Sequence, residues 1–325
     1  MRNKKQSFLF NSLLLLMISS FFSCGNHESK SDSNSDNETS GKVNITVDEE
    51  FRPLFDSMIT AFEGSYKNAK ITVSYKPELD ALKDLYSDSV RLVIVPHKLN
   101  AEELKYFESR GFTPKQTTVA LDGIAFIVNP ENPDSNIYRE QLLDVLTGKI
   151  TRWGKLRNNS FDGEITIITD NENSSAVRYL REEINLNAEL PKNIYAAKGN
   201  EAVIDYVKKN KYSLGMIGVN WVSDLHDPKM LGFLKDIKVV ATTAVNDSIK
   251  QLLSDQNYFW LKPQQSWILL KYYPFIRELN IINIEGKSGL GTGFSAYAMS
   301  EIGQLIVQHS GLLPANLSGR VIKFK

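Results

Sequence analysis

Short β-branched runs alternate with helical patterns from Lys42 onward, and this alternation limits the fold more than any other feature of the sequence. Residues 43–47 form a predicted strand, and apolar side chains between Phe51 and Phe62 then recur at the 3.6-residue period of an amphipathic helix. The same order continues with a strand at 71–75, a helix at 79–86 and a buried strand at 90–95. Strand, helix, strand succession favours a mostly parallel sheet covered by helices, so we expect an α/β fold.

The rest of the chain keeps this alternation. Asn100, followed three residues later by Glu103, matches the capping box that opens a helix. A long strand is predicted from Thr117 to Asn129, with an interruption at Asp122–Gly123. The other predicted elements are helices at 139–146, 174–184, 201–209 (capped by Asn200) and 294–308, and strands at 165–169, 213–218 and 276–284.

Two extended runs, near residues 120 and 280, are placed to carry the chain between lobes. We therefore expect one lobe from 42–121 plus 280–325 and a second, inserted lobe from 122–279, with a ligand cleft between them. A chain of 325 residues agrees with this division, since a domain holds about 150 residues on average.

The composition excludes several functions. The chain has 38 basic and 38 acidic residues, which argues against the broad basic surface of nucleic-acid-binding proteins. One cysteine excludes a disulfide framework and a Cys-based zinc site, and four histidines leave little material for another metal centre. No Gly-x-Ser-x-Gly elbow or comparable signature surrounds a nucleophile. We expect no metal, no cofactor, no nucleic-acid partner and no enzymatic activity.

The N-terminal segment has the pattern of an export signal followed by a tether. Basic residues precede an apolar run at 8–22, which is shorter than the roughly 20 residues of a membrane-spanning helix. The run is followed by Cys24, which resembles the lipid acceptor of bacterial lipoproteins; a plain signal with an incidental cysteine is the alternative. Residues 25–41 contain no large apolar side chain and are typical of a flexible segment. We expect a signal peptide at 1–23, then a lipidated cysteine and tether at 24–41.

Five segments match, in order and spacing, the motifs of a known family. The most specific is Gly-Lys-Ile-Thr-Arg-Trp at 148–153. The others are Leu-Asp-Gly-Ile-Ala-Phe-Ile-Val-Asn-Pro at 121–130, Asn-Ser-Ser at 173–175, Leu-Gly-Met-Ile-Gly at 214–218 and Tyr-Pro-Phe-Ile-Arg at 273–277. Over residues 42–325 the chain resembles the PstS-like family, the phosphate-binding components of phosphate ABC transporters. The resemblance implies a two-lobed periplasmic-binding-protein (type II) architecture that closes on its ligand by hinge motion.

The resemblance places the ligand at Ser174 and Ser175, the first residues of a predicted helix. Their hydroxyls would lie beside unpaired backbone N–H groups, where the helix dipole favours an anion. The structural alternative is an ordinary N-cap, in which serine is common for stability alone. In the family this segment usually reads Ser-Gly-Thr, with an arginine four positions earlier. Here that earlier position is Asp170.

Two further departures make the expected site acidic. The first strand ends in Asp48-Glu49-Glu50 where the family has a Gly/Ser/Thr-rich turn, and we include Asp48 and Glu49 among the site residues. Where the family usually has an aspartate after the third strand, this chain has His97-Lys98. Asp122 is a further candidate. Unscreened carboxylates about 4 Å from a dianion repel it by several kcal/mol at an effective dielectric near 20.

Arg178 is a candidate replacement for the missing arginine. It lies four residues after Ser174 on the same helix face, and helical side chains lean toward the N-terminus. The alternative role for Arg178 is an ion pair with Glu182 at i+4. His97 or Lys98 would add positive charge from the other lobe, whereas Asp48 has an alternative role as a helix N-cap.

We therefore expect a monomeric lipoprotein, exported to the periplasmic side of a membrane or to the cell surface, that binds an oxyanion, phosphate, and delivers it to an ABC permease. Two alternatives remain open. One is a sensor or protein-interaction lipoprotein built on the same fold, and the other is a binding protein for a different small solute. Asp170 and the acidic first turn favour the first of these alternatives.

Overall fold

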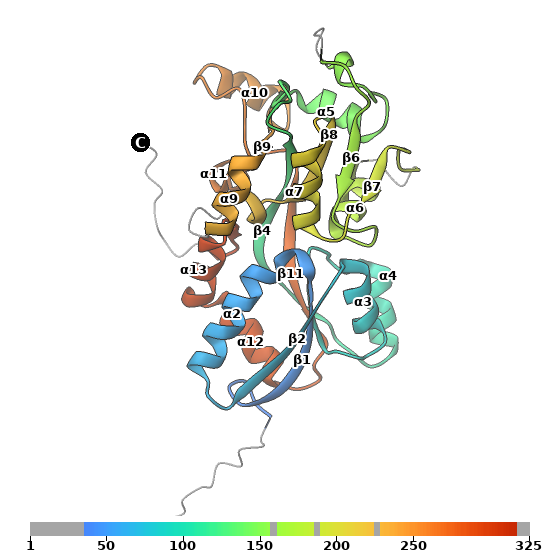
Figure 1. Cartoon of the computed structure of the whole chain (residues 1–325). Coiled ribbons are helices and arrows are strands. Elements are labelled where there is room, and N and C mark those ends of the chain that lie inside the picture. Colours follow the sequence, from blue (N-terminus) through green and yellow to red (C-terminus); the bar gives the residue numbers. More distant parts are fainter. Residues whose placement is uncertain (1–35, 157–160, 185–188, 224–227, 317–325) are drawn as a thin grey trace, which may run out of the picture. The chain divides into compact units, whose positions relative to one another are not determined.

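One mixed β-sheet runs through the fold, in the strand order β2-β1-β3-β11-β4-β8-β6-β7 (Figure 1). β9 and β12 each pair with β4 beside this path, and β10 pairs with β5 in a separate two-stranded sheet. The strands are β1 (Gly41–Asp48), β2 (Ala69–Lys76), β3 (Leu92–Val95), β4 (Lys115–Val128), β5 (Asn136–Ile137), β6 (Thr166–Thr169), β7 (Ile194–Ala196), β8 (Ser213–Gly218), β9 (Lys238–Val239), β10 (Ala241–Thr242), β11 (Ile276–Asn283) and β12 (Leu313–Pro314).

The two ends of the main sheet are parallel, whereas its centre is antiparallel. β1 pairs in parallel with β2 and β3, and β6 pairs in parallel with β7 and β8. β11 runs antiparallel to both β3 and β4, and β4 runs antiparallel to β8. The expected α/β fold is confirmed, with parallel pairing in each end of the sheet and the antiparallel strands β4 and β11 joining the two ends.

β4 is one uninterrupted strand of 14 residues, and the predicted break at Asp122–Gly123 is wrong. Asp122 lies opposite Arg277 of β11, and Gly123 lies opposite Ile276. From Ile124 onward the same strand pairs with β8 instead. An Asp-Gly pair often marks a turn, but strand pairing along the whole of β4 keeps the backbone extended here.

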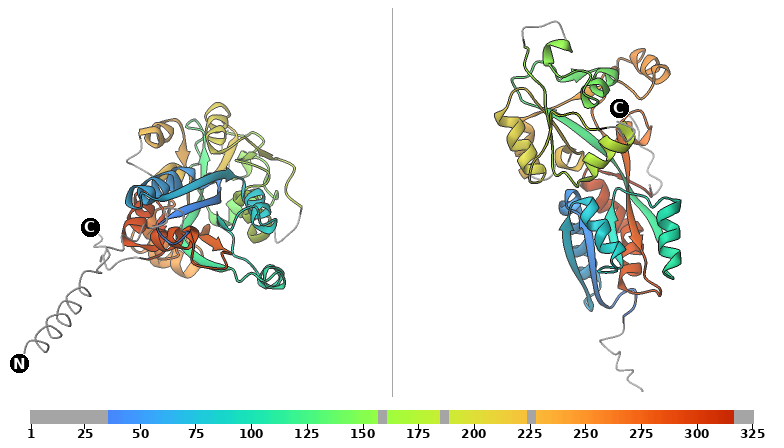
Figure 2. Two further views of the ribbon diagram at one scale, coloured as in Figure 1. Left: turned by 90° about the horizontal axis from the view of Figure 1, so that it is seen from below. Right: turned by 90° about the vertical axis from the view of Figure 1, so that its right-hand side faces the viewer.

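Helices cover both faces of the β1–β3 end of the sheet (Figure 2). Because successive side chains of a strand point to opposite faces, Leu92 and Ile94 of β3 enter one apolar cluster, and Val93 and Val95 enter another. The first cluster includes side chains of α2 and α12, and the second includes side chains of α3 and α4. These helices are α2 (Arg52–Ser65), α3 (Glu78–Tyr86), α4 (Ala101–Ser109) and α12 (Leu290–Met299).

The predicted helix caps are confirmed at α4 and wrong at α7. The Asn100 side chain accepts hydrogen bonds from the amides of Glu102 and Glu103, and the Glu103 carboxylate accepts one from the Asn100 amide at 2.7 Å. α7 (Asn200–Lys209) starts at Asn200 itself, and its N-cap is Gly199 with a φ of 97°. Glycine adopts this left-handed conformation without the steric cost that a side chain would add.

The remaining helical segments include several short ones. Residues 174–184, predicted as one helix, form α6 followed by the π-helical turn η3. Trp153 and Trp221 are buried. The helices are α5 (Arg139–Leu146), α6 (Ser175–Tyr179), α8 (Asn220–Ser223), α9 (Pro228–Asp236), α10 (Asp247–Ser254) and α11 (Gln265–Leu269), with the short turns η1 (Glu49–Phe51), η2 (Trp153–Lys155) and η3 (Leu180–Ile184).

The predicted C-terminal helix at 294–308 is two helices, α12 and α13 (Glu301–His309). They separate at Ser300, whose backbone is extended with φ −68° and ψ 167°. The Ser300 hydroxyl accepts a hydrogen bond from the Gly303 amide at 3.3 Å and so caps α13. A serine N-cap favours the start of a new helix over continuation of the previous one.

The computed structural model describes residues 36–156, 161–184, 189–223 and 228–316. The expected signal peptide at 1–23, the lipidated Cys24 and most of the expected tether lie outside these residues. From Asp36 onward the chain forms one compact unit, and the lobe boundaries expected from the sequence remain a prediction. No helix within the described ranges has both the length and the apolar character to cross a bilayer.

Candidate functional site

A group of buried polar side chains gathers where the ends of several strands meet. We call it the Arg277 cluster, and each of its members is at most 5% exposed. β1 and η1 supply acids, β4 and the loop after β6 supply one more each, the start of α6 supplies two hydroxyls, and β11 supplies the arginine. The members are Asp48, Glu50, Asp122, Asp170, Ser174, Ser175 and Arg277.

The Arg277 guanidinium contacts three elements at once. Its Nε donates a hydrogen bond to Asp122 Oδ2 at 2.7 Å, which follows from the register that places the two residues opposite each other on β11 and β4. Its Nη1 donates to Ser175 Oγ at 2.9 Å, and its Nη2 donates to Glu50 Oε2 at 2.5 Å. Arg277 therefore ties η1, the turn that follows β1, to β4 and to the start of α6.

Glu50 is held in place by its backbone as well as by its side chain. Its amide donates to Asp48 Oδ1 at 3.1 Å, so Asp48 fills the N-cap role for η1 that the sequence left open. Its carbonyl oxygen accepts hydrogen bonds from Asn220 Nδ2 at 2.9 Å and from Trp221 Nε1 at 3.0 Å. The Ser175 hydroxyl donates to Glu50 Oε2 at 3.0 Å. These contacts hold the Glu50 carboxylate against Ser175 and Arg277.

The cluster contains an excess of acidic groups. Burial, reinforced by the charges of Glu50 and two other acids, raises the pKa of Asp48 well above its usual range. Burial also raises the pKa of Asp122 to about 6, although the Arg277 guanidinium opposes the shift. For Asp170, burial and the charge of Glu50 raise the pKa to about 7. Near neutral pH some of these carboxyl groups are therefore protonated, which reduces the electrostatic repulsion among them.

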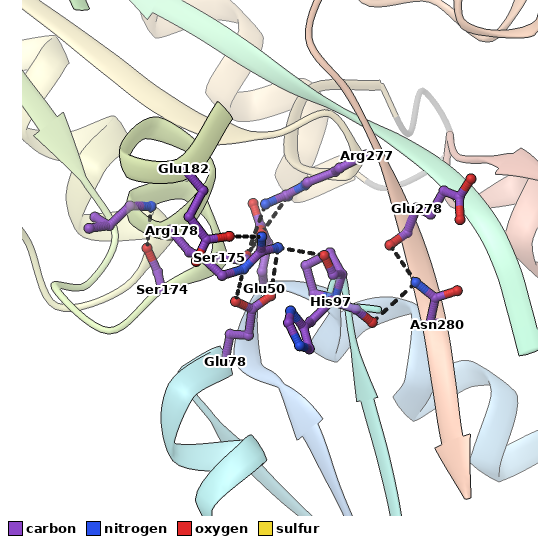
Figure 3. A network of polar contacts seen from close by, with 12 residues as sticks. Glu50, Glu78, His97, Ser174, Ser175, Arg178, Glu182, Arg277, Glu278 and Asn280 are labelled. Atoms are coloured by element: carbon purple, nitrogen blue, oxygen red, sulfur yellow. Dashed lines mark hydrogen bonds and ion pairs between the residues drawn. The ribbon is translucent and has the colours of Figure 1, made fainter. Parts of the chain in front are cut away.

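Arg178 belongs to a separate group at the edge of this region, the Arg178 cluster (Figure 3). Its Nε donates to Glu78, which is fully buried, and its Nη2 donates to the carbonyl oxygen of Pro96 at 2.6 Å. Its Nη1 donates to Glu182 Oε2 at 2.9 Å, the i+4 pair that the sequence left as an alternative. Its guanidinium is committed to these partners and forms no hydrogen bond with the Ser174 or Ser175 side chain among the described residues, although the Arg178 amide donates to the Ser174 carbonyl oxygen at 3.0 Å.

Two other predicted site residues lie outside the Arg277 cluster. His97 Nε2 lies 3.0 Å from the carboxylate of Glu103 on α4, and its carbonyl oxygen accepts a hydrogen bond from Asn280 (Figure 3). Glu49 is half-buried at the margin, where burial raises its pKa and the nearby Arg52 lowers it. The other predicted site residues lie together in the Arg277 cluster, and their role in binding a ligand stays a prediction: Asp48, Asp122, Asp170, Ser174 and Ser175.

Sequence reasoning did not assign roles to Arg277, Glu50 or Glu78. Arg277 was visible only as the last residue of the Tyr-Pro-Phe-Ile-Arg segment at 273–277. In the structure it alternates with exposed Glu278 along β11, and a buried arginine in a strand is a signal that a partner acid must lie nearby. The partner could be found only once the register of β11 against β4 was known.

The arrangement can hold an oxyanion by hydrogen bonds. Two donors, the Ser175 hydroxyl and the Arg277 guanidinium, converge on one carboxylate oxygen of Glu50. Arginine suits this purpose because its planar, permanently charged group matches the geometry of carboxylates and phosphates. Within the described ranges, no group of three or more His, Cys, Asp or Glu side chains has an arrangement suited to a metal ion.

The chain matches known proteins over most of its length. The model of the PBP superfamily domain matches residues 32–301. The phosphate-binding protein PstS of Borreliella burgdorferi is 23% identical over 269 residues, which cover 80% of this chain and 85% of that protein. The phosphate-binding protein PstS of Staphylococcus epidermidis strain ATCC 12228 is 22% identical over 259 residues, which cover 75% of each chain.

Solved structures with the same fold include transport proteins of two organisms. An ABC-type phosphate transport receptor from Vibrio cholerae superposes with a TM-score of 0.62 at 18% identity, over 84% of this chain and 100% of that one. PstS from Borrelia burgdorferi gives 0.53 at 21% identity, over 84% of this chain and 98% of that one. The expected type II binding-protein architecture and the resemblance to PstS-like proteins are thereby confirmed. The chain belongs to the PBP superfamily.

Proposed function

We propose that this protein is the solute-binding component of an ABC transporter and that its solute is phosphate. Relatives named phosphate-binding protein PstS in two bacterial genera support the proposal. In the structure the supporting observation is the convergence of the Ser175 hydroxyl and the Arg277 guanidinium on one buried anionic oxygen. Charge-assisted hydrogen bonds of this kind bind phosphate oxygens as they bind carboxylate oxygens.

Four members of the Arg277 cluster take a role in this proposal. Arg277 and Ser175 donate hydrogen bonds to the phosphate, and Arg277 supplies the positive charge that the family draws from the position of Asp170. The Ser174 hydroxyl accepts a hydrogen bond from the Val177 amide at 3.3 Å and caps α6. In the proposal this bond breaks and Ser174 supplies the second hydroxyl that contacts phosphate. The Asp122 carboxylate accepts a hydrogen bond from the P–OH group of monohydrogen phosphate. Sulfate carries no such proton at neutral pH and is repelled by the same carboxylate.

The lobe division expected from the sequence, 42–121 plus 280–325 and 122–279, belongs to the proposal. The antiparallel strands β4 and β11 join the two ends of the sheet and are the connections across which the lobes would close. The contacts of Glu50 with Ser175 and of Glu78 with Arg178 join residues of the two proposed lobes. Closure would trap the solute, which is later released unchanged to a permease, without catalysis.

Export and anchoring are proposed on the N-terminal sequence. We propose that residues 1–23 are removed, that Cys24 is lipidated and that the part of the 25–41 segment before Asp36 tethers a monomeric binding protein to the membrane, since Gly41 already belongs to β1. Cys24→Ser should move the protein from the membrane fraction to the soluble fraction of fractionated cells. Unchanged partitioning of this variant would contradict the lipid anchor while leaving the solute assignment intact.

Isothermal titration of the purified protein with inorganic phosphate tests the proposed solute. We expect saturable one-to-one binding of phosphate, no binding of sulfate at the same concentration, and a rise in melting temperature with phosphate. A ligand present at 100 times its Kd stabilises a protein by about 2.7 kcal/mol. Binding of sulfate as tight as that of phosphate would contradict the role of the acidic groups. Binding of another solute in place of phosphate would support the alternative of a binding protein for a different small solute.

A further inference from the structure

The donors that would hold an anion in the Arg277 cluster already hold one that belongs to the chain. Glu50 Oε2 accepts the Ser175 hydroxyl at 3.0 Å and the Arg277 Nη2 at 2.5 Å, and the Glu50 side chain is fully buried. Both donors are those expected to bind a solute oxygen. The Glu50 carboxylate is therefore placed where an oxyanion ligand would be bound.

The position of Glu50 is built into the local structure. Its carbonyl oxygen is fixed by Asn220 and Trp221, and its amide is fixed by Asp48. Its second carboxylate oxygen, Oε1, has no hydrogen-bond partner among the described residues and lies against the backbone of Gly218, where an added Cβ would come within 2.4 Å of it. A buried carboxylate with one oxygen unsatisfied is costly to maintain, which is expected of a group that shares its position with a ligand.

We propose that Glu50 is a resident competitor of the ligand and that it determines the affinity of the site. The inference rests on the proposed function, because the ligand in question is the phosphate assigned there. A dianion and an ionised carboxylate cannot both accept hydrogen bonds from the same hydroxyl and guanidinium, and their charges repel at this distance. Phosphate binds only when the Glu50 side chain leaves Ser175 and Arg277.

Arg277 has partners within the chain, so its charge is neutralised before a ligand binds. Arg277 remains paired with Asp122 when Glu50 moves, since that bond comes from neighbouring strands and not from η1. The Glu50 bonds instead connect η1 with α6 and β11, so the same carboxylate also holds these segments together without a ligand. Removal of the Glu50 charge is thus expected to free the donors without unfolding the protein.

The test compares Glu50→Gln and Glu50→Ala with the wild-type protein in titrations with inorganic phosphate. We expect both variants to bind phosphate at least tenfold more tightly than the wild type. Glu278→Gln is the matched control, because it removes the same charge beside Arg277 from an exposed side chain of β11. Its Kd should equal that of the wild type.

The other outcomes separate the two proposals. Equal phosphate affinity in the wild type and both Glu50 variants would overturn the competitor role and leave the proposed function standing. Weaker binding by the variants would also overturn it, since Glu50 would then support the ligand. Absence of phosphate binding in all three proteins would contradict both proposals together.

A crystal structure of the wild-type protein grown with phosphate gives a second test that requires no variant. We expect phosphate oxygens in contact with Ser175 and Arg277 and the Glu50 carboxylate turned away from both. Phosphate bound while Glu50 keeps its contacts with Ser175 and Arg277 would overturn the inference even if the variants proved unstable.

Discussion

Arg277 and Arg178 each bind a fully buried glutamate across a long separation in sequence, but their surroundings differ (Figure 3). Arg178 meets Glu78, Glu182 and a backbone carbonyl, and its side chain is 13% exposed. Arg277 is 3% exposed and lies among several carboxyl groups. Burial alone would lower the pKa of Arg277, but the charges of Glu50 and Asp122 raise it above its usual range.

The difference is between a buried ion pair whose acid is fully hydrogen-bonded and one that lies beside unsatisfied carboxylate oxygens. Around Arg178 both carboxylate oxygens of Glu78 accept hydrogen bonds from the guanidinium, as expected of an ion pair that joins two parts of a fold. Around Arg277, in contrast, Glu50 and Asp48 each retain an oxygen without a hydrogen bond among the described residues. Buried polar groups are rarely left in this state without a functional reason. The four predictions that follow test this contrast.

Arg277→Ala should have the largest effect. Removal of one partner from a buried ion pair typically destabilises a protein by about 3–5 kcal/mol, and here Glu50 and Asp122 both lose their partner. Phosphate binding should disappear. Chemical denaturation and titration calorimetry measure the two effects. Arg277→Lys keeps the charge but not the fork of donors, and retention of full affinity in this variant would contradict the role of the guanidinium.

Arg178→Ala should destabilise the protein by about 3 kcal/mol, because Glu78 remains buried without its partner. The phosphate Kd should change less than tenfold, since Arg178 lies outside the Arg277 cluster. Denaturation curves with and without phosphate separate the two effects. Glu78→Gln in the Arg178→Ala background should restore part of the lost stability. Complete loss of phosphate binding in a folded Arg178→Ala variant would move Arg178 into the binding site.

Asp170→Asn should stabilise the protein above pH 7 and leave it little changed near pH 4. The folded-state pKa of Asp170 is raised to about 7, so its contribution to stability is fully present below the unfolded pKa and is lost as pH rises through 7. The pKa is raised by about three units from 3.8 and each unit corresponds to about 1.4 kcal/mol, so the gain at pH 8 has an upper limit of about 4 kcal/mol. Unfolding free energies of both proteins from pH 4 to 8 measure it, and a constant difference across this range would contradict the shift.

Glu182→Ala should have the smallest effect. The Glu182 side chain is 44% exposed and pairs with Arg178 at i+4 on the same helical segment. Such pairs stabilise helices by about 0.2–0.5 kcal/mol. Thermal unfolding at low and high salt should show a small loss that salt removes. A loss above about 1 kcal/mol would mean that Glu182, and not Glu78 alone, holds Arg178 in place.

Much of the fold follows from local patterns in the sequence. The helical face from Phe51 to Phe62 became α2, and the Asn100–Glu103 capping box formed as expected. These features depend on residues only a few positions apart, where periodicity and capping chemistry determine the outcome. Predictions failed where a local signal was overruled by distant contacts, as at Asp122–Gly123 within β4.

The sequence by itself determined the α/β class, the family resemblance and the prediction that Ser174, Ser175 and nearby acids form the site. Only the tertiary structure decided which arginine side chain contacts this group. Arg277 lies 102 residues from Ser175, 155 from Asp122 and 227 from Glu50. Arg178, four residues from Ser174, was the nearer candidate but turns to Glu78. Strand register brings Arg277 opposite Asp122, and such long-range pairing depends on the whole sheet and leaves no periodic signal along the chain.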